Sequence, residues 1–274
     1  MTANTPTGTA APLATTAEAM WALGDYALMA DEVMAPLGPV LVAAADIGPH
    51  DLVLDVAAGS GNISIPAAAT GATVISSDLT PELLARSQSR AAAQGVTLQW
   101  RKADAESLPF GAGQFDIVVS AVGVMFAPHH QQAADEMVRV CRPGGTVGVI
   151  SWTYEGFFGQ MLNTIRPYQP TVRPGIPPAS LWGREDYAGR LLGGRVEEVS
   201  ARRGMLKVDR FDSAPAVHNY FKNHYGPTIN AYRTIGNNPA LAATLDAQLV
   251  ELAEAHLHDG EMGWEYLLVT ARKR

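Results

Sequence analysis

A glycine turn that follows a short apolar strand constrains the fold of this 274-residue chain more than any other feature. Residues 51–56 (DLVLDV) are almost continuously apolar, which is typical of a strand buried on both faces of a parallel sheet. Gly59 and Gly61 come next, and residues 60–69 have the pattern of a helix. The glycines let the backbone approach a ligand closely, and the start of the helix offers free N–H groups. The segment therefore predicts a nucleotide-cofactor site at the end of the first strand.

The alternation of strand and helix continues along the chain. Apolar runs of strand length recur at residues 73–77, 96–100, 115–120, 146–152, 195–210 and 264–271. Helical patterns lie between and after them, at residues 81–94, 131–141, 184–192, 212–224 and 239–256. Such alternation is typical of a parallel sheet covered by helices on both faces. We therefore expect an α/β fold with a Rossmann-like, doubly wound sheet.

Four regions follow from the composition of the chain. The Thr- and Ala-rich residues 1–15 are predicted to be a disordered tail, and residues 16–48 an N-terminal helical lid. Residues 49–153 form the predicted cofactor-binding core. Residues 154–274 are expected to supply helical cap elements over the substrate together with the remaining strands of the same sheet.

Three acidic residues indicate which cofactor the crevice suits. The dinucleotide fingerprint requires a third glycine where this chain has Ser64, and Asp55 inside the first strand would repel a pyrophosphate. Asp55 suits an ammonium group instead. Asp78 ends the second strand, where a carboxylate can accept ribose hydroxyls, and Asp104 follows the third, where one can accept the adenine amino group. S-adenosylmethionine carries an ammonium group, a cationic sulfonium and no phosphate, and therefore fits these residues.

Four segments together resemble the class I S-adenosylmethionine-dependent methyltransferases, most closely their ubiquinone/menaquinone-type branch. These segments are residues 55–61 (DVAAGSG), 78–84 (DLTPELL), 104–110 (DAESLPF) and 139–145 (RVCRPGG). The resemblance spans roughly residues 50 to 152, and Ala57 stands where the family usually has glycine. It implies a seven-stranded, mostly parallel sheet whose last strand is antiparallel and lies beside the fifth.

The resemblance also implies the activity. S-adenosyl-L-methionine would donate a methyl group to a small molecule and leave S-adenosyl-L-homocysteine. Flanking segments such as residues 20–26 and 123–128 resemble actinobacterial methyltransferases, some of which belong to natural-product pathways. The residues expected to bind the cofactor are Tyr26, Asp55, Ala57, Gly59, Gly61, Asp78, Leu79, Asp104, Ala105 and Ser120.

Aromatic and apolar residues outside the glycine turn suit a flat or hydrophobic acceptor, whose acceptor atom can be carbon, oxygen or nitrogen. For most of them, packing in a core is an equally good interpretation, and the sequence does not decide between the two. The residues expected to contact the acceptor are Trp21, Met125, Phe126, Trp152, Phe157, Trp182, Tyr220, His224 and Tyr225.

His129 and His130 follow the fourth predicted strand and are the candidates for a catalytic base, because imidazole titrates near neutral pH. The alternative is a surface pair at the start of a helix, which the position favours. Methyl transfer from a sulfonium mainly needs orientation and desolvation, so a base is required only if the acceptor must first lose a proton.

Bulk properties exclude several other partners. The net charge of −7 and the lack of a basic block exclude nucleic acid as a substrate class. No apolar run reaches the length of a membrane span, so no membrane partner is expected. The single cysteine, Cys141, rules out an intramolecular disulfide and fits a reducing compartment, so we expect a cytoplasmic protein. No metal site is expected, and a homodimer is compatible with the sequence.

Two rival functions remain open at this point. One is a nicotinamide-dependent reductase on a similar fold, which the missing third glycine and the lack of a Tyr-x-x-x-Lys pair disfavour. The other is a non-catalytic module that binds S-adenosylmethionine without turnover.

Overall fold

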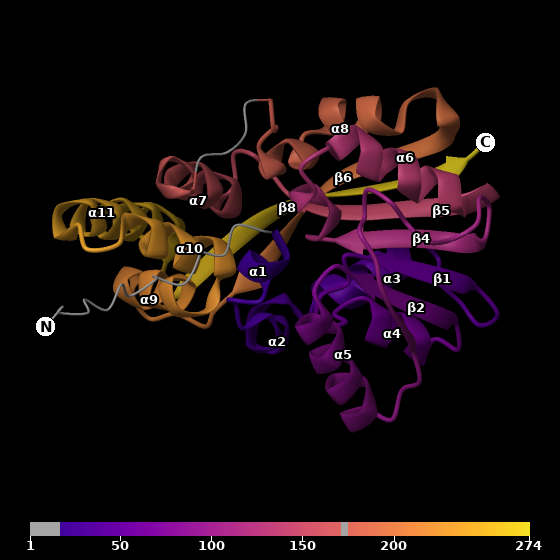
Figure 1. The fold of residues 1–274 in the computed structure, drawn as a ribbon, viewed down its shortest axis with the longest axis horizontal. Helices are drawn as coiled ribbons and strands as arrows, with labels where there is room; N and C mark the ends of the chain where they lie inside the picture. Colours follow the sequence, from indigo (N-terminus) through magenta and orange to yellow (C-terminus); the bar gives the residue numbers. More distant parts are fainter. Residues whose placement is uncertain (1–16, 171–174) are drawn as a thin grey trace, which may run out of the picture.

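One mixed sheet runs through the fold, with the strand order β3-β2-β1-β4-β5-β8-β6 (Figure 1). The computed structural model describes residues 17–170 and 175–274, so the predicted tail at residues 1–15 lies outside the described residues. The seven main strands are β1 (Leu52–Val56), β2 (Thr73–Asp78), β3 (Gln99–Lys102), β4 (Phe115–Ala121), β5 (Cys141–Trp152), β6 (Val196–Val208) and β8 (Glu261–Lys273). The two-residue strand β7 (Leu257–His258) pairs only with β8.

The directions of the strands match those of the expected fold. Strands β1 to β5 pair in parallel, whereas β8 lies between β5 and β6 and is antiparallel to both. The α/β, Rossmann-like sheet with an antiparallel last strand beside the fifth is therefore confirmed. The apolar pattern of the inner strands explains their position, because Val53, Leu54 and Val118 are completely buried.

Helices connect most of the parallel strands, as the alternating pattern predicts, whereas a loop without a helix joins β3 to β4. The connecting helices are α4 (Ser64–Ala69), α5 (Pro81–Ala93) and α6 (His130–Val140), and α8 (Glu185–Leu192) packs on α6. Pro81 occupies the first turn of α5, where its missing N–H has no partner to lose. The third strand begins at Gln99 rather than at residue 96, and the fifth already begins at Cys141.

The N-terminal helical region is broken into short pieces. They are α1 (Ala17–Trp21), α2 (Tyr26–Met29), the π-helical turn η1 (Ala30–Met34) and α3 (Leu37–Ala44). The first break is at Gly24, where a Cβ atom would lie only 2.4 Å from the ring of Tyr26. We call residues 17–34 the N-terminal segment.

A group of four helices gathers at one end of the sheet, on the left of Figure 1. These cap helices are α7 (Phe157–Ile165), α9 (Ala214–His224), α10 (Gly226–Ile235) and α11 (Pro239–His256). The sequence patterns predict α9 and α11 but not α7 or α10. Large aromatic side chains attach the cap to the sheet: Trp152 of β5 stacks on Phe158 with ring centroids 4.5 Å apart, and Trp264 of β8 lies against both.

Across the described ranges, no single helix is long and apolar enough to cross a membrane. Two neighbouring helical stretches reach the necessary length and composition only together, and they are bent by 75° relative to each other.

Candidate functional site

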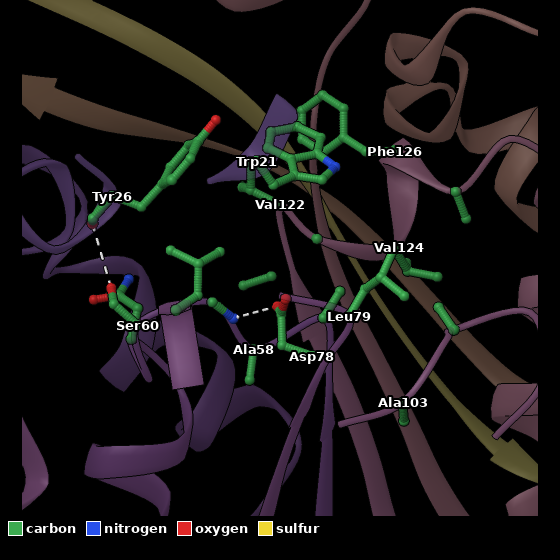
Figure 2. Close-up of a pocket in the computed structure, with 18 of the residues that line it drawn as sticks. Trp21, Tyr26, Ala58, Ser60, Asp78, Leu79, Ala103, Val122, Val124 and Phe126 are labelled. Atoms are coloured by element: carbon green, nitrogen blue, oxygen red, sulfur yellow. Dashed lines mark hydrogen bonds between the residues drawn. The ribbon is translucent and has the colours of Figure 1, made fainter. Parts of the chain in front are cut away.

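A cavity of about 230 Å³ opens at the carboxyl ends of β1 to β4. This is the place where open α/β sheets bind their ligands. Its floor comes from the loops that follow these strands, and the N-terminal segment borders it on another side (Figure 2). Residues predicted to bind the cofactor make up much of its wall, namely Tyr26, Ala57, Gly59, Asp78, Leu79, Asp104 and Ala105.

The glycine turn after β1 has the open backbone that the sequence predicts. Gly59 and Gly61 have φ angles of +57° and +88°. A Cβ atom at Gly59 would meet nothing within 4 Å, so this residue leaves free space, whereas one at Gly61 would lie 2.5 Å from Ser87 Oγ. Gly61 therefore packs the loop against α5 and does not border the cavity. Ala57 also has a positive φ, +53°, which is an uncommon conformation for a residue with a side chain.

Asp78 connects the end of β2 to the glycine turn. Its Oδ2 accepts a hydrogen bond of 2.8 Å from the N–H of Gly59, and its Oδ1 accepts one of 2.8 Å from the N–H of Thr80. The side chain is 6% exposed, and burial raises the pKa of this carboxyl above its ordinary value. The two backbone donors fix the orientation of the carboxylate at the cavity wall.

Asp55 lies behind the glycine turn rather than in the cavity wall. It is 1% exposed, and its Oδ2 accepts a hydrogen bond of 2.6 Å from Ser64 Oγ. Its Oδ1 has no hydrogen-bond partner among the described residues. Burial raises the pKa of Asp55 to about 7, and the hydrogen bonds from Ser64 oppose this shift only in part.

The loop after β3 supplies a more exposed acidic wall. The Asp104 carboxylate borders the cavity and accepts a hydrogen bond of 2.9 Å from the N–H of Glu106. Glu106 also borders the cavity, and its side chain accepts hydrogen bonds from the backbone N–H of His129 and pairs with the His129 ring at 2.8 Å. This pair joins the loop after β3 to the loop after β4.

The loop after β4 turns sharply toward β1. Ser120 Oγ donates a hydrogen bond of 2.7 Å to the carbonyl oxygen of Val56 and accepts one of 2.9 Å from the N–H of Val124. Ser120 thus holds the loop against the end of β1 through these two hydrogen bonds and does not itself border the cavity. Val122, which does border it, has a φ of +52°, an unusual conformation for a β-branched residue. Strained backbone of this kind is found preferentially at functional sites.

Three aromatic rings form one side of the cavity. Trp21 lies 4.7 Å from Phe126 and 5.6 Å from Tyr26, measured between ring centroids. The break at Gly24 explains how Trp21 and Tyr26 both reach the cavity, although five residues on a continuous helix would turn them apart. We call Trp21, Tyr26 and Phe126 the aromatic wall (Figure 2).

Most of the other residues predicted to contact the acceptor lie elsewhere. Met125, Trp152, Phe157, Trp182, Tyr220 and Tyr225 are buried in the core and do not border the cavity. His224 lies beside Tyr220 on α9, as the spacing predicts, with ring centroids 5.2 Å apart, but it too is outside the cavity wall. Trp152, Phe157 and Tyr225 pack in the group of rings that attaches the cap to the sheet, whereas Trp182 packs against His130. Geometry therefore supports Trp21 and Phe126 from this set.

Neither candidate base reaches the cavity. His129 is exposed and paired with Glu106, whereas His130 is buried against Trp182 with Nδ1 3.0 Å from the Tyr187 hydroxyl. Burial lowers the pKa of His130 to about 4, which keeps its ring neutral. The catalytic role of these histidines stays a prediction without support from the geometry. Groups of acidic, His and Cys side chains able to hold a metal ion are absent from the described residues.

The structure adds cavity residues that sequence reasoning did not select. They are Ala30, Met34, Ala58, Ser60, Asn62, Leu83, Ala103, Glu106, Ala121, Val122, Gly123, Val124, Ala127 and Pro128. Glu106 belongs to the same loop as Asp104, and Val122 to the apolar stretch after the fourth strand, so a signal existed for both. No signal in the sequence pointed to Met34, because it reaches the cavity through a π-helical turn. Its carbonyl oxygen accepts a hydrogen bond from the Asn62 amide.

Comparison with known proteins agrees with this geometry. The family model of the methyltransferase domain matches residues 54–149. An uncharacterized protein of Mycobacterium tuberculosis is 68% identical over 274 residues, which covers 100% of both chains. The demethylmenaquinone methyltransferase of Thermus thermophilus is 35% identical over 102 residues, which is 36% of this chain and 46% of that protein.

A solved structure shows the same fold at low sequence identity. The YcgJ protein of Bacillus subtilis has a TM-score of 0.58 and 16% identity, and the match covers 86% of this chain and 97% of that one. The match to the domain model includes β1 with its glycine turn, Asp78 and Asp104, the residues that surround the cavity. The chain therefore carries a class I S-adenosylmethionine-dependent methyltransferase domain.

Proposed function

We propose that this methyltransferase acts on a small, neutral and largely apolar metabolite, which lies against the aromatic wall. The observation that supports this most strongly is the composition of that side of the cavity. Trp21, Tyr26 and Phe126 meet there with apolar residues of the loop after β4, Val122 and Ala127 among them. Such a surface favours flat, apolar groups, because it offers them burial and few competing polar contacts.

The charged residues of the cavity fit the cofactor. Along the described wall they are Asp78, Asp104 and Glu106, with no Lys, Arg or His among the lining residues. A pyrophosphate would face these carboxylates without a compensating cation, whereas the sulfonium and ammonium groups of S-adenosylmethionine are attracted to them. This pattern argues against the nicotinamide alternative.

Each cofactor-binding residue has a proposed task. The free space at Gly59 admits the methionine end, the fixed Asp78 carboxylate accepts the ribose hydroxyls, and Asp104 accepts the adenine amino group. The orphaned Oδ1 of Asp55 suits an ammonium group reached through water. When bound, the cofactor supplies a methyl group on a cationic sulfur that is a good leaving group.

The protein then contributes orientation and desolvation rather than a strong base. The N-terminal segment acts as a lid, because its contacts extend to both sides of the cavity. The carbonyl oxygen of Tyr26 accepts a hydrogen bond from Ser60 Oγ, and its hydroxyl accepts one from the N–H of Gly226 in the cap. A closed lid excludes water and holds the acceptor near the methyl group. Natural-product intermediates belong to the proposed class of acceptors.

Methyl-labelled S-adenosylmethionine tests the proposed acceptor class. The purified chain would be incubated with separate sets of hydroquinones and phenols, of free amino acids, and of short peptides, and the products analysed by mass spectrometry. We expect label in the aromatic set alone. Transfer to amino acids or peptides would contradict the proposal, and tight cofactor binding with no transfer to any set would favour a non-catalytic binding module.

A further inference from the structure

We propose that the aromatic wall discriminates the charge of the cofactor, holding the cationic sulfonium of the methyl donor more tightly than the neutral thioether of the product. The inference rests on the proposed placement of the methyl end of the cofactor against Trp21, Tyr26 and Phe126. It assigns these rings a task beyond contact with the acceptor.

The first observation is the convergence of the rings. Trp21 ends α1, Tyr26 begins α2, and Phe126 ends the 3₁₀ turn η2 (Val124–Phe126) after β4, so three separate pieces of chain supply one wall. The interplanar angles are 57° for Trp21 with Tyr26 and 62° for Trp21 with Phe126. Trp21 and Phe126 therefore meet edge to face, and all three rings border the cavity half-buried.

The second observation is the charge of the opposite side. Figure 2 shows Trp21 and Phe126 at one side of the space, with Asp78 and Leu79 facing them across it. The face of an aromatic ring carries negative partial charge and attracts a cation within about 6 Å of its centroid. Asp78 and Asp104 add full negative charge, and no cationic side chain among the described lining residues offsets it. Both sides of the cavity therefore favour a positively charged ligand group.

The charge on the sulfur atom changes during turnover. The wall faces a cation before methyl transfer and a neutral sulfur afterwards, because the electron pair of the broken bond stays on sulfur. An apolar wall made of aliphatic side chains would offer the cation no such attraction. A wall of three rings loses part of its attraction at the moment the reaction is complete, which favours release of the product.

Calorimetry with three ligands tests the inference without an acceptor. Dissociation constants for S-adenosylmethionine, S-adenosylhomocysteine and sinefungin, an analogue with an ammonium group in place of the methyl sulfonium, would be measured for the wild type, Trp21→Leu and Phe126→Leu. We expect the preference for the methyl donor over the product to fall by about threefold to thirtyfold in Trp21→Leu. Sinefungin should weaken in parallel with the methyl donor.

Matched variants separate charge recognition from packing. Trp100→Leu removes a tryptophan of β3 that lies outside the cavity, and it should leave the preference unchanged. Trp21→Phe keeps a ring and should retain most of the preference. If Trp21→Leu does not fold, the same dissociation constants measured for Phe126→Leu provide the test.

An equal loss of affinity for all three ligands in both leucine variants would overturn the inference, because it would show apolar contact alone. Failure of the proposed function has a different signature. In that case the preference would still depend on Trp21, but label would not reach an apolar aromatic acceptor.

Discussion

Replacing Asp78 with alanine is expected to weaken binding of S-adenosylhomocysteine by about tenfold to a hundredfold, because a hydrogen-bonded, charged acceptor is lost. Asp78 is buried and oriented by the N–H groups of Gly59 and Thr80, so no neighbouring carboxylate can take its position. Its removal also leaves the Gly59 N–H without its acceptor, which loosens the turn. Calorimetric titration of the folded variant at neutral pH measures the effect.

Two controls accompany this measurement. Asp209→Ala removes an exposed carboxylate that does not border the cavity, and it should bind like the wild type. Asp104→Ala should lose less affinity than Asp78→Ala, because Asp104 is exposed to solvent and water can replace it. Unchanged affinity in a folded Asp78→Ala variant would show that the ribose is held elsewhere.

The contribution of Asp55 to the stability of the cofactor-free protein is expected to fall as the pH rises from about 4 to about 7, whereas buried His130, with its pKa lowered to about 4, contributes in the opposite direction. Burial raises the pKa of Asp55 to about 7 in the folded state, whereas the ordinary pKa of an exposed Asp is 3.8. Between these values the folded state retains a proton that the unfolded state has lost, so raising the pH favours unfolding. The Asp55 contribution falls by about 4 kcal/mol in total, and it levels off above pH 7. Urea denaturation at a series of pH values measures it.

Asp55→Asn is the matching variant for this prediction. An amide does not ionise in this range, so the difference in free energy of unfolding between the variant and the wild type isolates Asp55 from His130, and the gain of the variant should be larger at pH 8 than at pH 4. Asp78 is also buried with a raised pKa, so some dependence remains in the variant. Identical pH profiles for the variant and the wild type would mean that Asp55 is not the group responsible.

The sheet was predictable because its strands carry two independent signals. Each inner strand is an apolar run bounded by turn residues. The strands β1 and β2 and the edge strand β3 also lead into a glycine turn or an acidic residue at the carboxyl end. Those residues meet at one edge because parallel strands all end there. The cap was less predictable. Helix α10 begins with Gly226 and Pro227, residues that are typical of a turn, and it packs against α9 and α1, contacts that a local sequence pattern does not reveal.

The candidate site likewise contains residues whose roles the sequence predicts and residues whose roles it does not. Asp78 and Gly59 were predictable because their roles depend on backbone geometry at the ends of strands. The roles of Trp152 and Phe157 were not, because the same apolar pattern describes a cavity wall and a packed core. Here Trp152 stacks on Phe158 inside the core, while Trp21 and Phe126 border the cavity. The positive φ of Val122 could not be predicted either, because a valine in the sequence does not indicate this backbone conformation.

The most direct test of the account follows a labelled methyl group into a complex mixture of small molecules. The chain would be incubated with methyl-labelled S-adenosylmethionine and a deproteinised metabolite extract, which is then partitioned between an organic and an aqueous phase, with Asp78→Ala as the control. We expect label in neutral aromatic compounds of the organic phase, and much less label with the variant. Label confined to charged compounds of the aqueous phase would contradict it.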